Sequence, residues 1–224
     1  MCLKRITNMI IETMGRRRAP VTYTKSLFHF DGTNYSTNFI DETGKVWINE
    51  GNRGYLLTGS KVFGTASLFV QLEASESAFC KIKYTGNYSD LSLEWDNFTV
   101  DFWAWPSRGG FFNNTALNLS VNNSLLYADF YADSVLNRFT ADVSGGWRHV
   151  AFCRNNNSNK LYIDGVLKSE STTGNLYNAS TPYIGYGYGN NSFSRTVGMD
   201  ELRISSVARW TSDFTPPTSA YTLD

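Results

Sequence analysis

From Ser26 onward the chain consists of short segments in which apolar and polar residues alternate, with turn residues between them. In "FTVDFWAWP" (98–106), for example, Phe98, Val100 and Phe102 share one parity. Alternation with a period of two is the pattern of a half-buried β-strand, because successive side chains point to opposite faces. Almost no helical periodicity is visible in this part. The pattern therefore predicts an all-β domain of antiparallel strands, either a sandwich or a closed barrel.

Turn residues predict where individual strands end. In "KLYIDGVLKS", Asp164-Gly165 separates two apolar runs and supplies the positive φ angles of a tight hairpin. Pro106 is expected to stop the strand before it, because proline lacks a backbone N–H. The stretch "YADSVLNRF" (131–139) is compatible either with one or two helical turns after Asp133 or with a strand and a loop.

The composition fits one large domain rich in turns. Hydrophobic residues make up 42% of the 224 residues, which is enough to build a full core. Aromatic residues, at 15%, are abundant, whereas charged residues, at 18%, are fewer than usual. We therefore expect a surface that relies on hydrogen bonds and ring faces more than on charge.

The net charge of zero is unevenly distributed. Residues 1–25 carry six basic side chains and one acidic side chain, a net charge of +5, and the remaining chain carries −5. We predict a basic N-terminal arm at 1–25 and a folded domain at 26–224. The arm has two interpretations: it anchors the domain to an anionic partner through Arg16, Arg17 and Arg18, or it is a disordered, solvated terminus.

The three cysteines, Cys2, Cys80 and Cys153, are dispersed and odd in number. This pattern predicts neither a disulfide framework nor, with only two histidines, a zinc site. The N-terminus lacks a continuous apolar region, and no stretch has the length of a membrane span. We therefore expect neither a signal peptide nor a membrane segment.

The stretch "GWRHVAFCRN" (146–155) places a histidine and a cysteine among apolar residues, so it is either a catalytic cluster or part of a folded sheet. Val150 and Phe152 occupy one face of the expected strand, while the other face is also largely apolar, which is typical of a buried strand. His149 and Cys153 are four residues apart, about 13 Å along a strand, too far for a thiolate–imidazole pair. We interpret the cluster as a buried wall of the sheet.

Taken in order, these segments resemble the laminin-G-like branch of the concanavalin A-like lectin and glucanase jelly rolls. The resemblance covers residues 26 to 221 and implies an antiparallel jelly-roll β-sandwich. Domains of this kind are common in phage and other microbial surface proteins, where they bind carbohydrate or serve as structural modules. The matching segments are "SLFHFDG" (26–32), "FGTASLFV" (63–70), "FTVDFWAWP" (98–106), "GWRHVAFCR" (146–154), "LYIDGVL" (161–167), "YIGYG" (183–187), "MDELRISSVARW" (199–210) and "FTPPTSAY" (214–221).

A carbohydrate site would need aromatic rings to stack on sugars and amides or carboxylates to bind the hydroxyl groups. Trp103 and Trp105 share the strand face opposite the core stripe, which is either an exposed platform or packed under a loop. In the loop "YGYGNN" (186–191), Tyr186, Tyr188 and Asn190 are further candidates for contacts with a glycan.

The resemblance also implies a structural calcium ion, since many of these jelly rolls hold one. Asp31 in "FDG" and Asp200 in "MDE" lie on the first and last expected strands, which commonly pair in this architecture. Together they would supply oxygen ligands. The alternative is that Asp31 opens a turn and Asp200 caps an edge. We expect no other cofactor.

The related glucanases carry paired catalytic carboxylates at alternating positions of one strand. Glu73 and Glu76 have an odd spacing and would point to opposite faces, whereas Glu94 and Asp96 share a face. The rest of the glucanase pattern is missing, so we predict a protein that is not an enzyme. No phosphate-binding loop is present, and the acidic body disfavours nucleic acid as a partner.

We therefore predict a non-enzymatic protein of a virion surface, such as a decoration or fibre protein, whose lectin-like domain binds carbohydrate. The virus we expect first is a bacteriophage. The arm would bind a capsid or tail protein, and the domain would face outward on the virion surface. Two alternatives remain: a purely structural decoration protein, or a polysaccharide-degrading enzyme of the same superfamily. A homo-oligomer is compatible with this function, but no heptad pattern indicates one.

Overall fold

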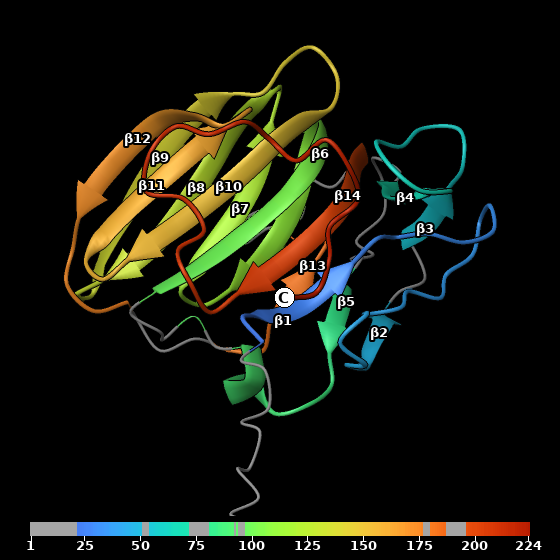
Figure 1. Cartoon of the computed structure of the whole chain (residues 1–224), viewed down its shortest axis with the longest axis horizontal. Helices are drawn as coiled ribbons and strands as arrows, with labels where there is room; N and C mark the ends of the chain where they lie inside the picture. Colours follow the sequence, from blue (N-terminus) through green and yellow to red (C-terminus); the bar gives the residue numbers. More distant parts are fainter. Residues whose placement is uncertain are drawn as a thin grey trace, which may run out of the picture.

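The computed structural model describes residues 22–50, 54–71, 81–91, 93, 97–176, 180–186 and 196–224. These residues form fourteen strands, every named pairing of which is antiparallel, and one 3-10 turn, Tyr88–Leu91 (Figure 1). They contain no α-helix, and hence no helix that could span a membrane. The predicted all-β antiparallel fold is confirmed.

The strands form two layers that share one long strand, β6 (Asn97–Asn114). The front layer runs β12-β11-β10-β6-β14, and the far edge of β14 pairs with β1 and with β4, which in turn pairs with β3. The back layer runs β9-β8-β7-β6-β13-β5-β2. The other front strands are β1 (Thr24–Phe28), β3 (Gly54–Leu57), β4 (Ser67–Gln71), β10 (Arg148–Asn155), β11 (Ser158–Ile163), β12 (Val166–Thr172) and β14 (Thr196–Ser205). The other back strands are β2 (Trp47–Glu50), β5 (Lys81–Tyr84), β7 (Leu117–Asn122), β8 (Leu125–Ala132), β9 (Val135–Asp142) and β13 (Tyr183–Ile184).

Strand β6 continues through Pro106, so the prediction that this proline ends its strand is wrong. The pairing of β6 with β10 ends at Ala104, and its pairing with β7 begins at Arg108. Between Trp105 and Arg108, β6 has one residue more than β14 opposite it, which marks a bulge. The missing N–H of Pro106 therefore falls where the strand changes layer and no ladder hydrogen bond is needed.

The main core lies between the two layers. It consists of the side chains at alternate positions of each strand, those that point inward. Phe98, Val100 and Phe102 of β6 are fully buried, as the alternation predicted. Across the layers, the ring of Phe152 on β10 lies 5.3 Å from that of Phe130 on β8. Each such buried ring stabilises the fold by roughly 1.5–3 kcal/mol relative to an exposed one.

Tight turns connect the hairpins. Asp164 and Gly165 have φ angles of 51° and 75°, which confirms the predicted hairpin between β11 and β12. Asp133 and Ser134 have φ angles of 49° and 65° and join β8 to β9 in the same way. The stretch 131–139 is therefore strand, turn and strand, and contains no helical turn.

Candidate functional site

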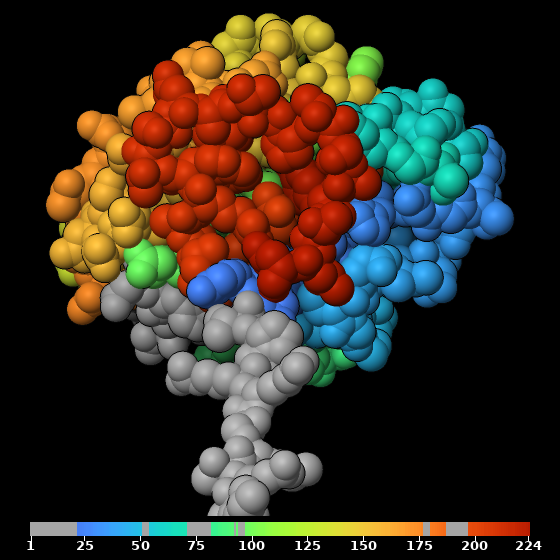
Figure 2. Space-filling view, in the orientation of Figure 1, coloured from blue at the N-terminus to red at the C-terminus, as the bar shows by residue number. Residues whose placement is uncertain are grey.

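The outer face of the front layer is divided into two halves by what lies over it. Residues 206–224, which we call the C-terminal tail, run out from β14 across β6, β10 and β11 and then return (Figure 1). In the space-filling view the red atoms that include this tail cover the centre of the face (Figure 2). We call the part beneath the tail the covered half. The open half lies beyond it, around Trp105 and Trp147.

Backbone contacts attach the tail to the covered half. The Thr99 hydroxyl donates to the Val207 carbonyl over 2.9 Å, and the Phe214 amide donates to the Gly165 carbonyl over 2.9 Å. A Cβ atom on Gly165 would collide with the Phe214 carbonyl oxygen. Glycine is therefore required here both for the positive φ angle of the hairpin and for the close passage of the tail.

A second, small hydrophobic cluster lies between the tail and the sheet. The rings of Trp210 and Phe214 in the tail are stacked, with centroids 3.9 Å apart and planes 7° apart. They pack against Ala151, Cys153 and Tyr162, which are buried on the outer face of β10 and β11. The tail thus makes this outer face part of the protein interior.

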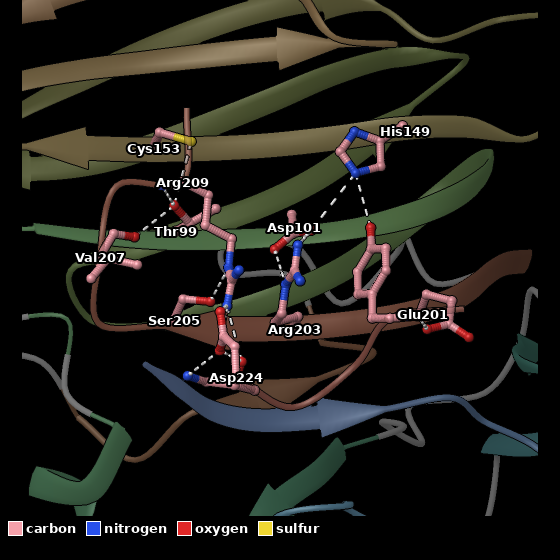
Figure 3. A network of polar contacts seen from close by, with 12 residues as sticks. Thr99, Asp101, His149, Cys153, Glu201, Arg203, Ser205, Val207, Arg209 and Asp224 are labelled. Atoms are coloured by element: carbon pink, nitrogen blue, oxygen red, sulfur yellow. Dashed lines mark hydrogen bonds and ion pairs between the residues drawn. The ribbon is translucent and has the colours of Figure 1, made fainter. Parts of the chain in front are cut away.

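Beneath the tail a buried network of polar side chains connects three strands (Figure 3). Arg203 donates to both carboxylate oxygens of Asp101, over 3.1 and 2.9 Å, and its guanidinium lies 4.2 Å above the ring of Tyr221. A hydrogen bond of 2.9 Å joins His149 Nε2 to the Tyr221 hydroxyl. Burial opposes ionisation of Asp101, but Arg203 and His149 more than offset this and hold its pKa below the usual range.

The stretch 146–155 is a wall of the sheet, as predicted, because both faces of β10 are buried. His149 has no exposed surface and Cys153 only 2%. Burial raises the pKa of the Cys153 thiol to about 12. A thiol that stays protonated at neutral pH is a poor nucleophile, so this cluster does not supply one.

In the open half, aromatic rings remain accessible. Trp105 is 39% exposed, and its ring lies 5.9 Å from that of Trp147, which in turn lies 6.5 Å from Phe69. Gly198 on β14 is opposite both Trp105 and Phe69. A Cβ atom on Gly198 would lie only 2.9 Å from Phe69 Cζ and from Trp105 Cβ, so the glycine makes room for these rings over β14.

A turn that carries a glycine borders the Trp105 ring. The turn before β10 places Gly146 beside it, since a Cβ atom there would lie 3.8 Å from Trp105 Cζ3. Arg148 holds this turn by donating from Nε to the Ser144 carbonyl over 2.7 Å and from Nη1 to Asp164 over 2.8 Å. Arg148 is opposite Ala104 of the main core, so it has the inward parity of β10 and not the outward parity of Trp147.

Trp103 and Trp105, two residues apart on β6, have different surroundings. Trp103 is half-buried, with its ring 6.0 Å from Phe63 in the loop between β3 and β4 and 5.4 Å from His149. Its Nε1 is buried and has no hydrogen-bond partner among the described residues. Of the two interpretations of this strand face, packing under a loop applies to Trp103 and an exposed platform to Trp105.

The predicted carbohydrate-binding residues do not lie together. Trp103 and Trp105 belong to the front layer, whereas Tyr186 follows β13 of the back layer, where its ring lies 6.0 Å from that of Tyr183. Tyr188 and Asn190 lie outside the described residues.

Asp31 and Asp200, the predicted calcium ligands, hold the same loop between β3 and β4. Asp200 Oδ2 accepts hydrogen bonds from the amides of Val62 and Phe63, over 2.7 and 3.1 Å. Asp31 accepts from the amide and the hydroxyl of Thr65. Burial raises the pKa of Asp200 to about 7, and its Oδ1 is buried without a partner in the described structure.

Both carboxylates therefore contact one loop, but their oxygens accept hydrogen bonds from its N–H and O–H groups. Calcium requires six to eight oxygen ligands. In the part of the chain that the structure describes, no group of three or more His, Cys, Asp or Glu side chains is arranged to hold a metal ion. The calcium site stays a prediction.

Several predicted residues fall outside the described part of the chain. They are the anchoring residues Arg16, Arg17 and Arg18 and the candidate catalytic carboxylates Glu73, Glu76, Glu94 and Asp96. Their predicted roles stay predictions.

Comparison with known families assigns the fold. A family model described as "Concanavalin A-like lectin/glucanases superfamily" matches residues 83–213, more than half of the chain. The chain belongs to this superfamily. The match contains β6, β10 and β11 and thus most of the face just described. A comparison with curated protein sequences finds no match.

Solved structures with the same fold include binding domains of a mosquitocidal protein and of botulinum neurotoxins. The binding domain of Paraclostridial Mosquitocidal Protein 1 superposes with a TM-score of 0.63 at 14% identity, covering 83% of this chain and 49% of that chain. The receptor-binding domain of botulinum neurotoxin C/D mosaic serotype superposes with a TM-score of 0.62 at 18% identity, covering 84% and 49%. This chain therefore spans about half the length of these structures, and identities this low show a shared fold only.

Sequence reasoning missed part of the open half. Trp147 lies in the stretch 146–155 interpreted as a buried wall and was not among the predicted carbohydrate-binding residues, although it precedes the first residue of β10 and is half-buried. Phe69, Tyr55 and Gly198 were not singled out. One signal was present for Gly198, because a glycine inside a strand pattern often marks close approach of another group.

Proposed function

We propose that this superfamily member is a non-enzymatic carbohydrate-binding module and that the glycan stacks on Trp105 and Trp147. The observation that carries the proposal is the 39% exposure of Trp105 on a sheet face whose other half is covered by the tail. A large exposed aromatic residue supported by a second ring and flanked by glycines is a suitable platform for the C–H face of a pyranose.

The surroundings of the platform fit this chemistry. Sugar hydroxyls need donors and acceptors at the edge of the stacking surface. We propose that such groups come from the turn beside Trp105, which carries Ser144 and Gly146 and is held by the Arg148–Asp164 pair.

The comparisons support the proposal at the level of the fold. One solved structure is the ligand-binding domain of botulinum neurotoxin serotype D in complex with N-acetylneuraminic acid; it superposes with a TM-score of 0.60 at 15% identity and covers 84% of this chain and 48% of that chain. A sugar is thus bound by a protein about half of whose length shares this fold, and we extend carbohydrate binding to this chain as a proposal.

A glycan array followed by calorimetry tests the proposal. Trp105→Ala is expected to weaken binding by about tenfold or more, because a stacking contact contributes about 1 kcal/mol and the edge contacts depend on it. Tyr131→Ala is the matched control, since Tyr131 is 37% exposed but lies on β8 of the back layer. Tyr186→Ala distinguishes the front layer from the other predicted position. If no glycan on the array binds the protein, a purely structural decoration protein is favoured.

The absence of enzymatic activity is part of the proposal. It is supported by the burial of His149 and Cys153, which leaves no thiolate–imidazole pair on β10. A reducing-sugar assay against mixed glucans and alginates is expected to show no product from the full chain. Product that disappears in the Glu94→Gln, Asp96→Asn variant would establish a polysaccharide-degrading enzyme instead.

We further propose that the domain lies on the surface of a virus particle, and we expect this virus to be a bacteriophage. The basic arm would bind a capsid or tail protein. The support is the charge of +5 in residues 1–25 beside a domain of charge −5. Deleting residues 1–21, which leaves β1 and the contacts of Tyr23 with the tail intact, is expected to remove the protein from the particle while glycan binding persists. Full occupancy of the truncated protein on the particle would refute anchoring by the arm.

A further inference from the structure

The two tryptophans belong to a longer row of aromatic residues that crosses the front layer. Trp105 on β6 is opposite Gly198 on β14, Gly198 is opposite Phe69 on β4, and Phe69 is opposite Tyr55 on β3. Residues directly opposite in antiparallel strands point to the same face of the sheet. The residues next to Phe69 and Tyr55, Leu68, Val70 and Leu56, belong to the core cluster, so the row faces outward.

Ring contacts add two further residues to the row. The ring of Trp147 lies 5.9 Å from that of Trp105 and 6.5 Å from that of Phe69, so it lies over this end of the row. At the other end the ring of Tyr35 lies 5.6 Å from that of Tyr55. Tyr35 is held beside β3 because its amide donates to the Leu56 carbonyl over 2.8 Å. We call Trp147, Trp105, Phe69, Tyr55 and Tyr35 the aromatic row.

Exposure is highest at positions that a ligand lying along the row would contact. Trp105 is 39% exposed, Tyr35 is 68% exposed, and Trp147 and Tyr55 are half-buried. Phe69, at 8%, forms the floor between them. The five side chains of the row carry no charge.

The spacing of the row matches an extended chain of sugars. Neighbouring strands lie about 4.8 Å apart, close to the length that one pyranose unit adds to an extended glycan, so a row crossing about five strand positions spans about four to five units. A single terminal sugar would cover only the Trp105–Trp147 end and leave the tyrosines without a function.

We infer that the aromatic row binds an extended, uncharged glycan chain that lies across the strands, with Trp105 and Trp147 at one end and Tyr55 and Tyr35 at the other. This inference rests on the proposed function and adds to it the class and the length of the ligand. The tyrosines act as additional contacts, so they matter only for a ligand long enough to reach them.

Affinity electrophoresis of the full chain in soluble glucan, mannan, xylan and polygalacturonate gels provides the first measurement. At least one neutral polymer is expected to retard the protein. Oligosaccharides of two to six units from that polymer are then titrated by calorimetry. Affinity is expected to rise by about two- to tenfold per added stacking contact, and to level off at about four to five units.

The variants separate the two ends of the row. Trp105→Ala is expected to weaken binding at every length. Tyr55→Ala and Tyr35→Ala are expected to leave the disaccharide affinity unchanged and to remove most of the gain between three and six units. Tyr131→Ala, on the back layer, is the control and is expected to behave like the unmodified protein at all lengths.

The outcomes distinguish the inference from the proposed function. Loss of binding in Trp105→Ala supports the proposed function. The inference is nevertheless wrong, and the proposed function stands, if the affinity of the unmodified protein does not increase with the length of the oligosaccharide or if the tyrosine variants bind as the unmodified protein does. The same holds if the unmodified protein binds only the acidic polymer or only short array glycans. If Trp105→Ala binds like the unmodified protein, or if nothing binds, both are wrong.

Discussion

The covered and open halves of the front layer are built by the same strands and yet differ in what they do. Both contain a pair of aromatic rings over the outward face of the sheet. In the covered half Trp210 and Phe214 stack at 3.9 Å and close a second core, whereas in the open half Trp105 and Trp147 meet edge-to-face at 5.9 Å and Trp105 stays exposed. The path of the tail, and not the residue type, makes one half structural and leaves the other available to a ligand.

The polar groups of the two halves differ in the same way. Beneath the tail, Asp101 and Arg203 form a buried ion pair, whose loss would leave a charge in a low-dielectric environment. At the start of β10, next to the turn that borders the open half, Arg148 and Asp164 form an ion pair in which both side chains are more than a third exposed, and such pairs contribute little to stability. We therefore expect substitutions in the covered half to change stability and substitutions in the open half to change binding.

The largest expected effect is on stability in the covered half. Arg203→Met removes the cation beside buried Asp101 and is expected to lower the free energy of unfolding by about 3–5 kcal/mol. Urea denaturation measures this loss. Lys83→Met is the control, because Lys83 pairs with Glu50 over 3.7 Å and both side chains are more than a third exposed; its expected loss is below about 1 kcal/mol. Equal losses in the two variants would contradict a special role for the buried network.

The next effect concerns Asp200 and pH. Its pKa is 3.8 as a free group and about 7 in the fold, so between these values the folded state holds a proton that the unfolded state has released. The stabilisation that this group contributes is therefore fully present below pH 3.8 and is lost as the pH rises toward 7, by an amount on the order of 4 kcal/mol.

Asp200→Asn is expected to flatten this dependence, because the amide oxygen still accepts from Val62 and Phe63. Urea denaturation at pH 4, 6 and 8 measures it. A shallower loss remains in the variant, since Glu201 raises the pKa of His29 and that stability disappears as the pH rises through the raised value. Identical pH profiles for the variant and the unmodified protein would refute the role of Asp200.

An intermediate effect is expected at Gly198, where both stability and binding should change. Gly198→Ala places a Cβ atom 2.9 Å from Phe69 Cζ and Trp105 Cβ, and overpacking of this kind costs about 1–3 kcal/mol. Displacement of these rings is expected to weaken glycan binding as well, measured by calorimetry. Gly59→Ala is the control, because a Cβ atom there meets nothing within 4 Å. Unchanged binding in Gly198→Ala would mean that the ligand does not use this part of the row.

The smallest effect tests whether the two halves are independent. Tyr221→Phe removes the hydrogen bond to His149 and is expected to cost about 1 kcal/mol. Glycan binding should stay the same, because Tyr221 contacts only the covered half in the described structure. If the variant remains folded but binds the glycan more weakly, the hydrogen bond beneath the tail affects the conformation of the open half.

Much of the fold could be predicted because its determinants are local. Period-two alternation in β6 identified Phe98, Val100 and Phe102 as core residues, and Asp164-Gly165 identified a hairpin. The two apolar faces of β10 identified His149 as a buried residue. The candidate site was predicted less well, because Trp105 was selected together with residues that lie on the other layer or outside the described chain.

The sequence by itself determined the strands, their turns and which parity of each strand enters the main core, since these depend on neighbouring residues and on backbone sterics. Only the tertiary structure decided that β6 passes through Pro106 from one layer to the other, and that Trp103 packs under a loop while Trp105 remains exposed. The physical reason is that equivalent positions on one strand face differ only in what crosses over them. Here a loop held by Asp31 and Asp200 and a tail attached at Thr99 and Gly165, all far apart in the sequence, make that difference.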